Sequence, residues 1–146
     1  MGYYSDVRLT VSEEGFKQLY SFIGAWCEEH DCYDPLRYCD KLFHGDDGYL
    51  ICWNDQKWYS DFPEVQAVQA GLKELEETNY AYSYCRLGEE LGDVETAYHH
   101  STRENEPDPE NYMPGIYQHF DDKNIVHWCG LEDVIAEHRE ADDLER

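Results

Sequence analysis

Carboxylates are the most numerous side chains in this sequence that could take part in chemistry. The chain holds 33 Asp and Glu residues against 11 Lys and Arg residues, so its formal net charge at pH 7 is -22. A surface with this charge repels nucleic acids and anionic membranes and attracts basic proteins. Carboxylate pairs suited to acid–base catalysis are expected in any cleft of so acidic a chain, so they do not indicate an enzyme.

Some of these carboxylates are close together in the sequence and are candidates for binding a partner. Duplex DNA carries one charge per ~1.7 Å of axis, so a charge of this size corresponds to about 37 Å of duplex. A folded chain of this length is about 38 Å across. The protein could therefore occupy a nucleic-acid-binding groove as a decoy if its charges share one face, whereas the alternative is an ordinary solvated acidic surface. The candidate carboxylates are Glu28, Glu29, Asp31, Asp46, Asp47, Glu89, Glu90 and Asp93.

Cysteine and histidine residues between Cys27 and His44 are of the types that bind zinc. The Cys27-x4-Cys32 spacing is not the C-x2-C knuckle of zinc sites, and no second knuckle follows. Cys27 also falls on an apolar helical stripe, where a thiol acts as a small hydrophobic group. The sequence therefore predicts neither a metal site nor a cofactor.

Histidines near the middle and end of the chain form a second group, which contains His99, His100, His119 and His127. Adjacent residues of a strand point to opposite faces, so His99 and His100 are poorly placed to share a metal. No phosphate-binding loop, G-x-S-x-G or H-E-x-x-H motif is present. A Cys–His nucleophile pair stays open, but nothing selects one.

Aromatic residues are abundant, with 13 Tyr, 5 Phe and 4 Trp. Trp58, Tyr82 and Tyr84 lie on or beside predicted strands. If helices leave one face of the sheet uncovered, exposed Tyr and Trp there would serve as anchors for a protein partner. The alternative is packing within the core, which we favour for at least half of the aromatic residues near the sheet.

Periodicity places these residues on an alternating pattern of strands and helices. Alternation predicts strands at 7–11, 48–53, 80–87 and 94–98, and apolar spacings of three and four predict helices at 13–30 and from about 61 to 77. Residues 56–59 are a short strand or an extended entry into the second helix. The connector 31–47 is predicted to contain a short helical turn that includes Leu42 and Phe43.

This order predicts an α+β fold, with an antiparallel sheet of about four strands and two helices packed on one face. The ferredoxin-like split β-α-β arrangement is the nearest named topology. Residues 1–100 are expected to form the core domain and 101–115 an acidic, proline-containing linker. Residues 116–146 are expected to form a C-terminal appendage with a terminal helix at 131–144.

Signals for export or membrane insertion are not apparent. The first residues lack a basic and apolar leader, and no apolar run approaches the ~20 residues of a membrane helix. The six cysteines are therefore expected to be reduced thiols in the cytoplasm.

Short motifs suggest an origin. The stretches 1–7 (MGYYSDV), 53–59 (WNDQKWY) and 84–89 (YCRLGE), the last followed by Asp93-Val94-Glu95, resemble a group of small phage and prophage proteins. The resemblance spans residues 1–100 and implies no catalytic residues. Small acidic phage proteins often interfere with host defence, so the resemblance implies an anti-defence role by association.

The leading hypothesis is a phage-encoded acidic inhibitor that binds a basic host defence protein in the host cytoplasm, in the manner of an anti-CRISPR. It would contact neither nucleic acid nor membrane, and a homodimer is left open. One alternative is a small metal- or Cys-dependent enzyme that acts on a nucleotide signal. The other is a virion assembly protein.

Overall fold

The protein is an α+β structure, as the sequence predicts. The computed structural model describes residues 2–116, 120–122 and 132–133. Its main elements are β1 (Ser5–Ser12), α1 (Glu13–His30), β2 (Lys41–His44), β3 (Gly48–Gln56), α2 (Pro63–Glu77), β4 (Tyr82–Gly88) and β5 (Val94–His99). Smaller elements follow: the 3₁₀ helix η1 (Pro109–Tyr112) and the two-residue strands β6 (Gly115–Ile116), β7 (Phe120–Asp121) and β8 (Glu132–Asp133).

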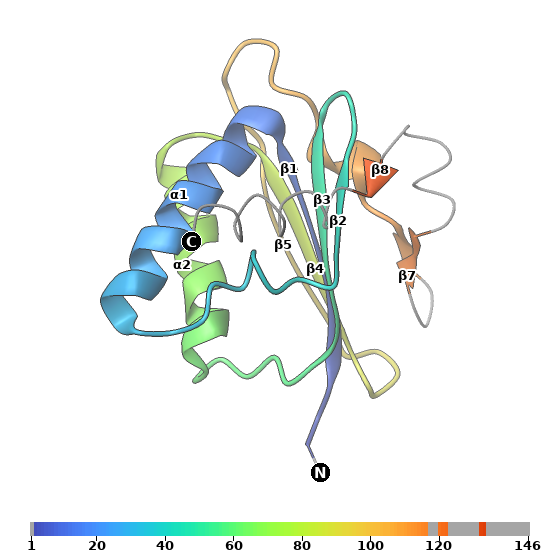
Figure 1. The fold of residues 1–146 in the computed structure, drawn as a ribbon. Helices are drawn as coiled ribbons and strands as arrows, with labels where there is room; N and C mark the ends of the chain where they lie inside the picture. The colour runs from blue at the N-terminus through green and yellow to red at the C-terminus, as the bar shows by residue number, and fades with distance from the viewer. Residues whose placement is uncertain (1, 117–119, 123–131, 134–146) are drawn as a thin grey trace.

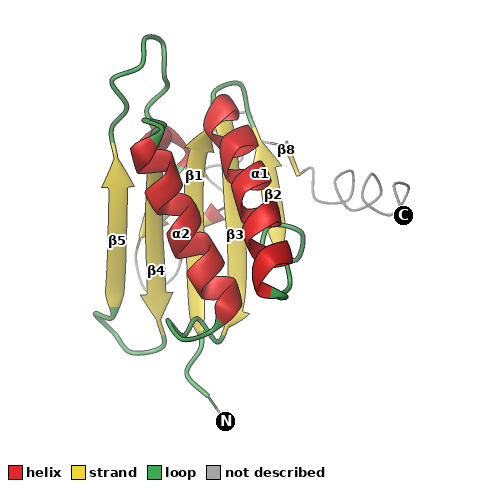
Figure 2. Ribbon diagram, turned by 90° about the vertical axis from the view of Figure 1, so that its left-hand side faces the viewer, coloured by secondary structure: helices red, strands yellow, loops and turns green. Residues whose placement is uncertain are grey.

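The main sheet is antiparallel, with the strand order β5-β4-β1-β3-β2-β8. Both helices lie on one face of it (Figure 1). Figure 2 shows the sheet from the side of the helices. The two helices lie over the middle strands, and the edge strand β5 lies outside the area that α2 covers. The part β4-β1-β3-β2, connected as β-α-β-β-α-β, has the strand order of ferredoxin-like domains.

Local chemistry explains where the helices begin and end. The Ser12 hydroxyl accepts a hydrogen bond from the Gly15 N–H (3.0 Å) and caps α1. Asp31 ends this helix in the left-handed conformation, with φ 53°. Pro63 occupies the first turn of α2, where its missing N–H costs no hydrogen bond.

The core lies between the helices and the sheet. Every second side chain in the middle of β1 faces the helices and is fully buried: Val7, Leu9 and Val11. Close packing of the two helices depends on Gly71, because a Cβ there would lie 2.6 Å from Leu19 Cδ1. The apolar stripes predicted for both helices supply this core.

The opposite face of the sheet carries both polar and apolar side chains, and much of it is also buried. Arg8 is 3% exposed, and its guanidinium forms an ion pair with Asp122 (2.8 Å) and stacks over the Phe120 ring (4.7 Å). The Glu106 carboxylate accepts a hydrogen bond from the Ser12 hydroxyl (2.7 Å). Helices leave this face free, as expected, but chain beyond residue 100 covers part of it.

The structure corrects some local predictions and decides between the alternatives in another. Leu42 and Phe43 form β2 rather than a helical turn, because they pair with Ile51 and Leu50 of β3. Glu132–Asp133 form β8 beside β2, where the first turn of a terminal helix was predicted. The remainder of the predicted helix at 131–144 lies outside the described residues. Residues 57–59 are an extended entry into α2, one of the two predicted alternatives.

Candidate functional site

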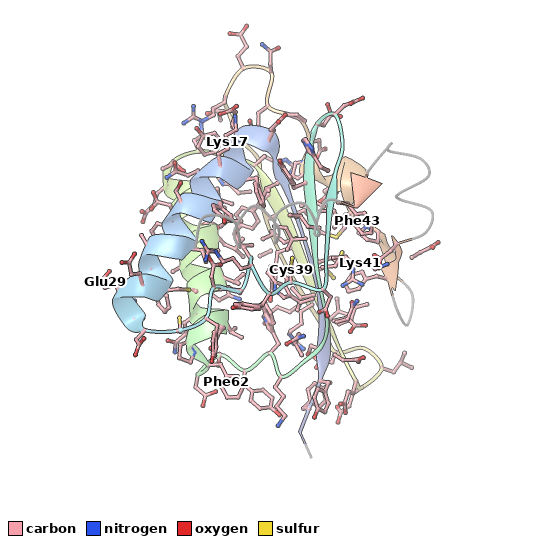
Figure 3. The ribbon with its side chains drawn as sticks, viewed as in Figure 1. Lys17, Glu29, Cys39, Lys41, Phe43 and Phe62 are labelled. Carbon is pink, nitrogen blue, oxygen red and sulfur yellow. The ribbon has the colours of Figure 1, made fainter. Side chains whose placement is uncertain are left out.

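The first predicted acidic cluster lies at the C-terminal end of α1. Glu28, Glu29 and Asp31 are all exposed, and Glu29 projects from the helix away from the sheet (Figure 3). The left-handed turn at Asp31 directs the chain into the connector that follows. This cluster is therefore held at one end of the helical layer.

The other two acidic clusters lie at opposite ends of the sheet. Asp46 and Asp47 occupy the turn before β3, and Glu89 and Glu90 occupy the loop after β4; all four are exposed. Because β1 is antiparallel to both β3 and β4, that turn and that loop lie at opposite ends of β1. Eight residues of strand span about 26 Å. The predicted clusters therefore do not form one compact patch.

Two of the predicted aromatic anchors, Tyr82 and Tyr84, belong to the core. They share one face of β4, as the alternation predicts, but that face is covered by the helices, and the side chains are 2% and 1% exposed. Their hydroxyls are also engaged: Tyr82 donates to Glu76 (2.6 Å), and Tyr84 accepts from Trp58 Nε1 (2.9 Å). They cannot contact a partner in this structure, which corrects their assignment.

Trp58 is half-buried and borders a hollow of about 440 Å³. We call it the aromatic hollow, and its lining residues are Tyr4, Tyr33, Asp34, Pro35, Tyr38, Trp53, Asp55, Gln56, Lys57, Trp58, Phe62, Glu64 and Val65. Seven large hydrophobic side chains are exposed within the described ranges, and four of them line this hollow: Tyr4, Tyr33, Tyr38 and Phe62. Exposed apolar surface is therefore concentrated at one place.

Four separate segments build the aromatic hollow, and the N-terminal one contributes Tyr4. The connector after α1 contributes Tyr33 and Tyr38, whose rings meet edge to face at 5.8 Å between centroids. The end of β3 contributes Trp53, whose indole N–H donates to the Pro35 carbonyl (2.9 Å) and ties this strand to the connector. The entry into α2 contributes Phe62 (Figure 3). Hydrogen bonds between the segments hold the hollow's shape.

The sequence did not single out Tyr33, Tyr38 or Phe62. Phe62 is the N-cap residue of α2 and is 37% exposed. The available signal was the presence of two tyrosines in a polar connector beside Pro35, where no strand or helix would bury them.

The charges in this hollow are mostly negative. Asp34, Asp55 and Glu64 line it together with one cation, Lys57. Asp55 and Glu64 form no hydrogen bond or ion pair through their carboxylates within the described part of the chain. Lys57 Nζ lies 6.0 Å from the centroid of the Tyr4 ring, so a cation already contacts one aromatic face here.

A second hollow of about 660 Å³ lies on the other side of Trp58, between α2 and strands β4 and β5. We call it the polar hollow, and its polar lining includes Tyr3, Ser5, Tyr84, Arg86, Asp93 and Glu95. Arg86 holds Asp93 through both terminal nitrogens, at 3.2 and 2.9 Å, and also donates to Ser5 Oγ (3.2 Å). Asp93, a predicted partner-binding residue, is therefore already paired.

Tyr3 adds a further bond to this network. Its hydroxyl donates to Asp93 Oδ2 (2.6 Å) and accepts from the Glu90 N–H (3.0 Å). The hydrogen bonds from Arg86 and then from Tyr3 lower the pKa of Asp93 below its usual range. The network joins the N-terminal segment to the β4–β5 loop, and its charges are satisfied internally.

Three of the described cysteines, Cys27, Cys52 and Cys85, do not have the properties of a catalytic nucleophile. Burial raises the pKa of Cys52 to about 12, and burial also raises the pKa of Cys27 and Cys85. A reactive cysteine needs the opposite shift, toward the thiolate. Among the residues that the structure describes, no three His, Cys, Asp or Glu side chains gather as a group able to hold a metal ion. His119, His127 and Cys129 lie outside the described residues.

Comparisons with family models, curated proteins and solved structures give no match for this chain. Within the described ranges, none of the helices combines the length and apolar character that spanning a bilayer requires. The site is therefore defined by its own geometry: an aromatic, acidic hollow that is open to a partner, beside a polar hollow in which Arg86 and Asp93 are paired.

Proposed function

We propose that this protein is a non-enzymatic, phage-encoded inhibitor that binds a basic host defence protein in the host cytoplasm, in the manner of an anti-CRISPR. One observation carries the proposal: four of the seven exposed large hydrophobic side chains in the described ranges line a single hollow. That hollow belongs to a chain with a net charge of -22. Aromatic anchors within a strongly charged surface are the features of a protein-binding face.

The arrangement at one end of the molecule supports this mode of binding. A smaller hollow of about 410 Å³ is lined by Glu28 together with Tyr33 and Tyr38, which also line the aromatic hollow. The exposed carboxylate of Glu28 at the end of α1 therefore adjoins the aromatic anchors. The carboxylates would steer a basic partner toward this end, and the rings would supply the short-range contacts.

The dispersed acidic clusters limit how the protein could act as a decoy. Asp46 and Asp47 lie at the far end of the sheet from Glu89 and Glu90, so a contact confined to one end of the molecule does not include all of them. We therefore propose that the end bearing the aromatic hollow enters the partner's nucleic-acid-binding surface. The remaining acidic residues act at longer range, through the overall negative potential.

Capture of partners from host lysate tests this proposal. Tagged protein is incubated with lysate and washed at low and at high salt, and retained proteins are identified by mass spectrometry. We expect a basic, nucleic-acid-binding defence protein that high salt releases, since exposed charges are screened at high ionic strength. The purified candidate should then lose nucleic-acid binding when one equivalent of the inhibitor is added.

Paired variants locate the surface used in that capture. The double variant Tyr33→Ser/Tyr38→Ser removes two exposed rings of the aromatic hollow, and Tyr98→Ser removes a comparably exposed ring from β5. We expect only the first to lose the captured protein. Recovery of the bait alone, or equal capture by both variants, would contradict the proposal.

A further inference from the structure

We propose that the aromatic hollow binds the guanidinium group of an arginine side chain presented by a protein partner. This inference rests on the proposed function for the identity of the partner. The chemistry of the hollow is tested separately, with a small probe. Four kinds of observation carry it: the exposed rings, the carboxylates among them, the internal cation over one ring, and the shape held by hydrogen bonds.

The rings offer faces of the kind that a guanidinium stacks on. Tyr33 and Tyr38 are 73% and 55% exposed, so much of their surface is open. Trp58 and Trp53 are tilted against each other at 5.1 Å between centroids and form the inner wall. Arginine stacks on aromatic faces through a planar, weakly hydrated cation, which a compact, strongly hydrated ammonium does less well.

Two carboxylates complete the fit for a cation. Asp55 and Glu64 line the hollow, and within the described residues their carboxylates have no ion-pair partner. A guanidinium can donate to carboxylates through its edge while its face lies on a ring. Glu64 also lies in the first turn of α2, where its charge offsets the positive end of that helix dipole.

Other occupants fit this chemistry less well. An apolar side chain would cover Asp55 and Glu64 and remove them from water without giving them a partner, which is costly. A nucleotide could stack on the rings, but its phosphates would approach those same carboxylates in a chain of net charge -22. The position of Lys57 Nζ at 6.0 Å from the Tyr4 centroid shows that this wall accepts a cation.

The test is a titration followed by NMR, with a short glycine-flanked peptide that carries one arginine. The matched probe replaces arginine with citrulline, which keeps the planar shape but has no charge. We expect the arginine peptide to shift the indole N–H signals of Trp53 and Trp58 in a saturable way. The citrulline peptide should bind at least ten-fold more weakly. Equal binding of the two peptides, or no saturable shift, would overturn the inference.

Variants separate this hollow from the general acidity of the chain. The double variant Tyr33→Ser/Tyr38→Ser should bind the arginine peptide at least ten-fold more weakly. The double variant Asp55→Asn/Glu64→Gln should bind it several-fold more weakly. The matched controls are Tyr98→Ser for the rings and Asp46→Asn/Asp47→Asn for the charges, and both should bind as the parent does. If the charge control weakens binding as much as Asp55→Asn/Glu64→Gln, the peptide is responding to net charge and the inference is wrong.

The peptide titration and the lysate capture can fail independently. If the peptide binds as expected but the lysate yields no defence protein, the hollow is an arginine site and the proposed function is wrong. If a defence protein is captured through Tyr33 and Tyr38 but the peptide does not bind, the proposed function stands and this inference is wrong.

Discussion

The two hollows on either side of Trp58 differ in how their polar groups are used. In the polar hollow, Arg86 is held by Asp93, and Asp93 also accepts from Tyr3, so charges and hydroxyls satisfy one another. In the aromatic hollow, Asp55 and Glu64 lie beside exposed rings, and neither carboxylate forms an ion pair in the described part of the chain. The first arrangement joins segments of the fold, and the second leaves binding groups open.

This difference separates stability from binding. A closed network resists ligands, because a new group would have to displace bonds that already exist. An open set of rings and carboxylates contributes little to folding and can gain contacts from a partner. Substitutions in the polar hollow should therefore change the free energy of unfolding, and substitutions in the aromatic hollow should change affinity.

The largest expected effect in the polar hollow comes from Arg86→Met. Removing the guanidinium leaves neighbouring carboxylates without their cation and should lower the free energy of unfolding by about 2 kcal/mol. Urea denaturation measures this change, with Lys73→Met on the exposed surface of α2 as the control. Affinity for the arginine peptide should stay within two-fold. Loss of peptide binding in a folded Arg86→Met variant would show that the two hollows are not independent.

Trp58→Phe should affect both hollows, because Trp58 lines each of them. The variant loses the hydrogen bond from Nε1 to the Tyr84 hydroxyl, which should cost about 1 kcal/mol of stability. It also replaces a large ring face with a smaller one, so the arginine peptide should bind a few-fold more weakly. Denaturation and peptide titration on the same sample check both changes. A change in stability alone, or in affinity alone, would contradict the conclusion that Trp58 contributes to both hollows.

Acid should lower the stability of the protein by protonating Asp93 in the polar hollow. Its pKa in the folded protein lies below the ordinary 3.8, so its contribution to stability is present above that value and is lost as the pH falls through the lower, folded pKa. Asp93→Asn should lower Tm at pH 7 and should flatten the loss of Tm below about pH 4. Thermal melts between pH 7 and pH 2.5 measure this. Parallel profiles for parent and variant would contradict the assignment.

The smallest expected effect is at Lys57, the cation in the aromatic hollow. The Lys57→Met variant lacks the positive charge that repels an incoming guanidinium. Its affinity for the arginine peptide should therefore rise about two- to three-fold, as expected for an exposed charge. Tm should not change, because this side chain is exposed. The NMR titration checks the affinity, and weaker binding would mean that Lys57 supports the ligand instead of competing with it.

Much of the frame could be predicted from local patterns. The bounds of α1 follow from the Ser12 cap and from the spacing of its apolar residues. That Tyr82 and Tyr84 share one face of β4 follows from the alternation of side chains along a strand. Alternation cannot say which face a second layer covers. The two tyrosines are therefore candidate partner anchors by sequence, with core packing as the alternative, and the structure shows that the helices bury them.

The aromatic hollow could not be predicted in the same way. Tyr33, Trp53 and Phe62 come from three segments whose approach depends on how α1, β3 and α2 pack. The β2 strand was missed for the same reason, since Leu42 and Phe43 are strand residues only through pairing with β3. The acidic clusters were recognised as exposed, but their separation across the sheet depends on antiparallel pairing.

The sequence alone determined the net charge, the two helices, the alternation of the main strands and the α+β class, because each depends on composition or on residues a few positions apart. Tertiary structure decided that Arg8 is buried against Asp122, 114 positions away, and that exposed rings meet around one hollow. Such contacts depend on chain segments meeting in three dimensions. No local period encodes which distant segment will cover a face or complete a hollow.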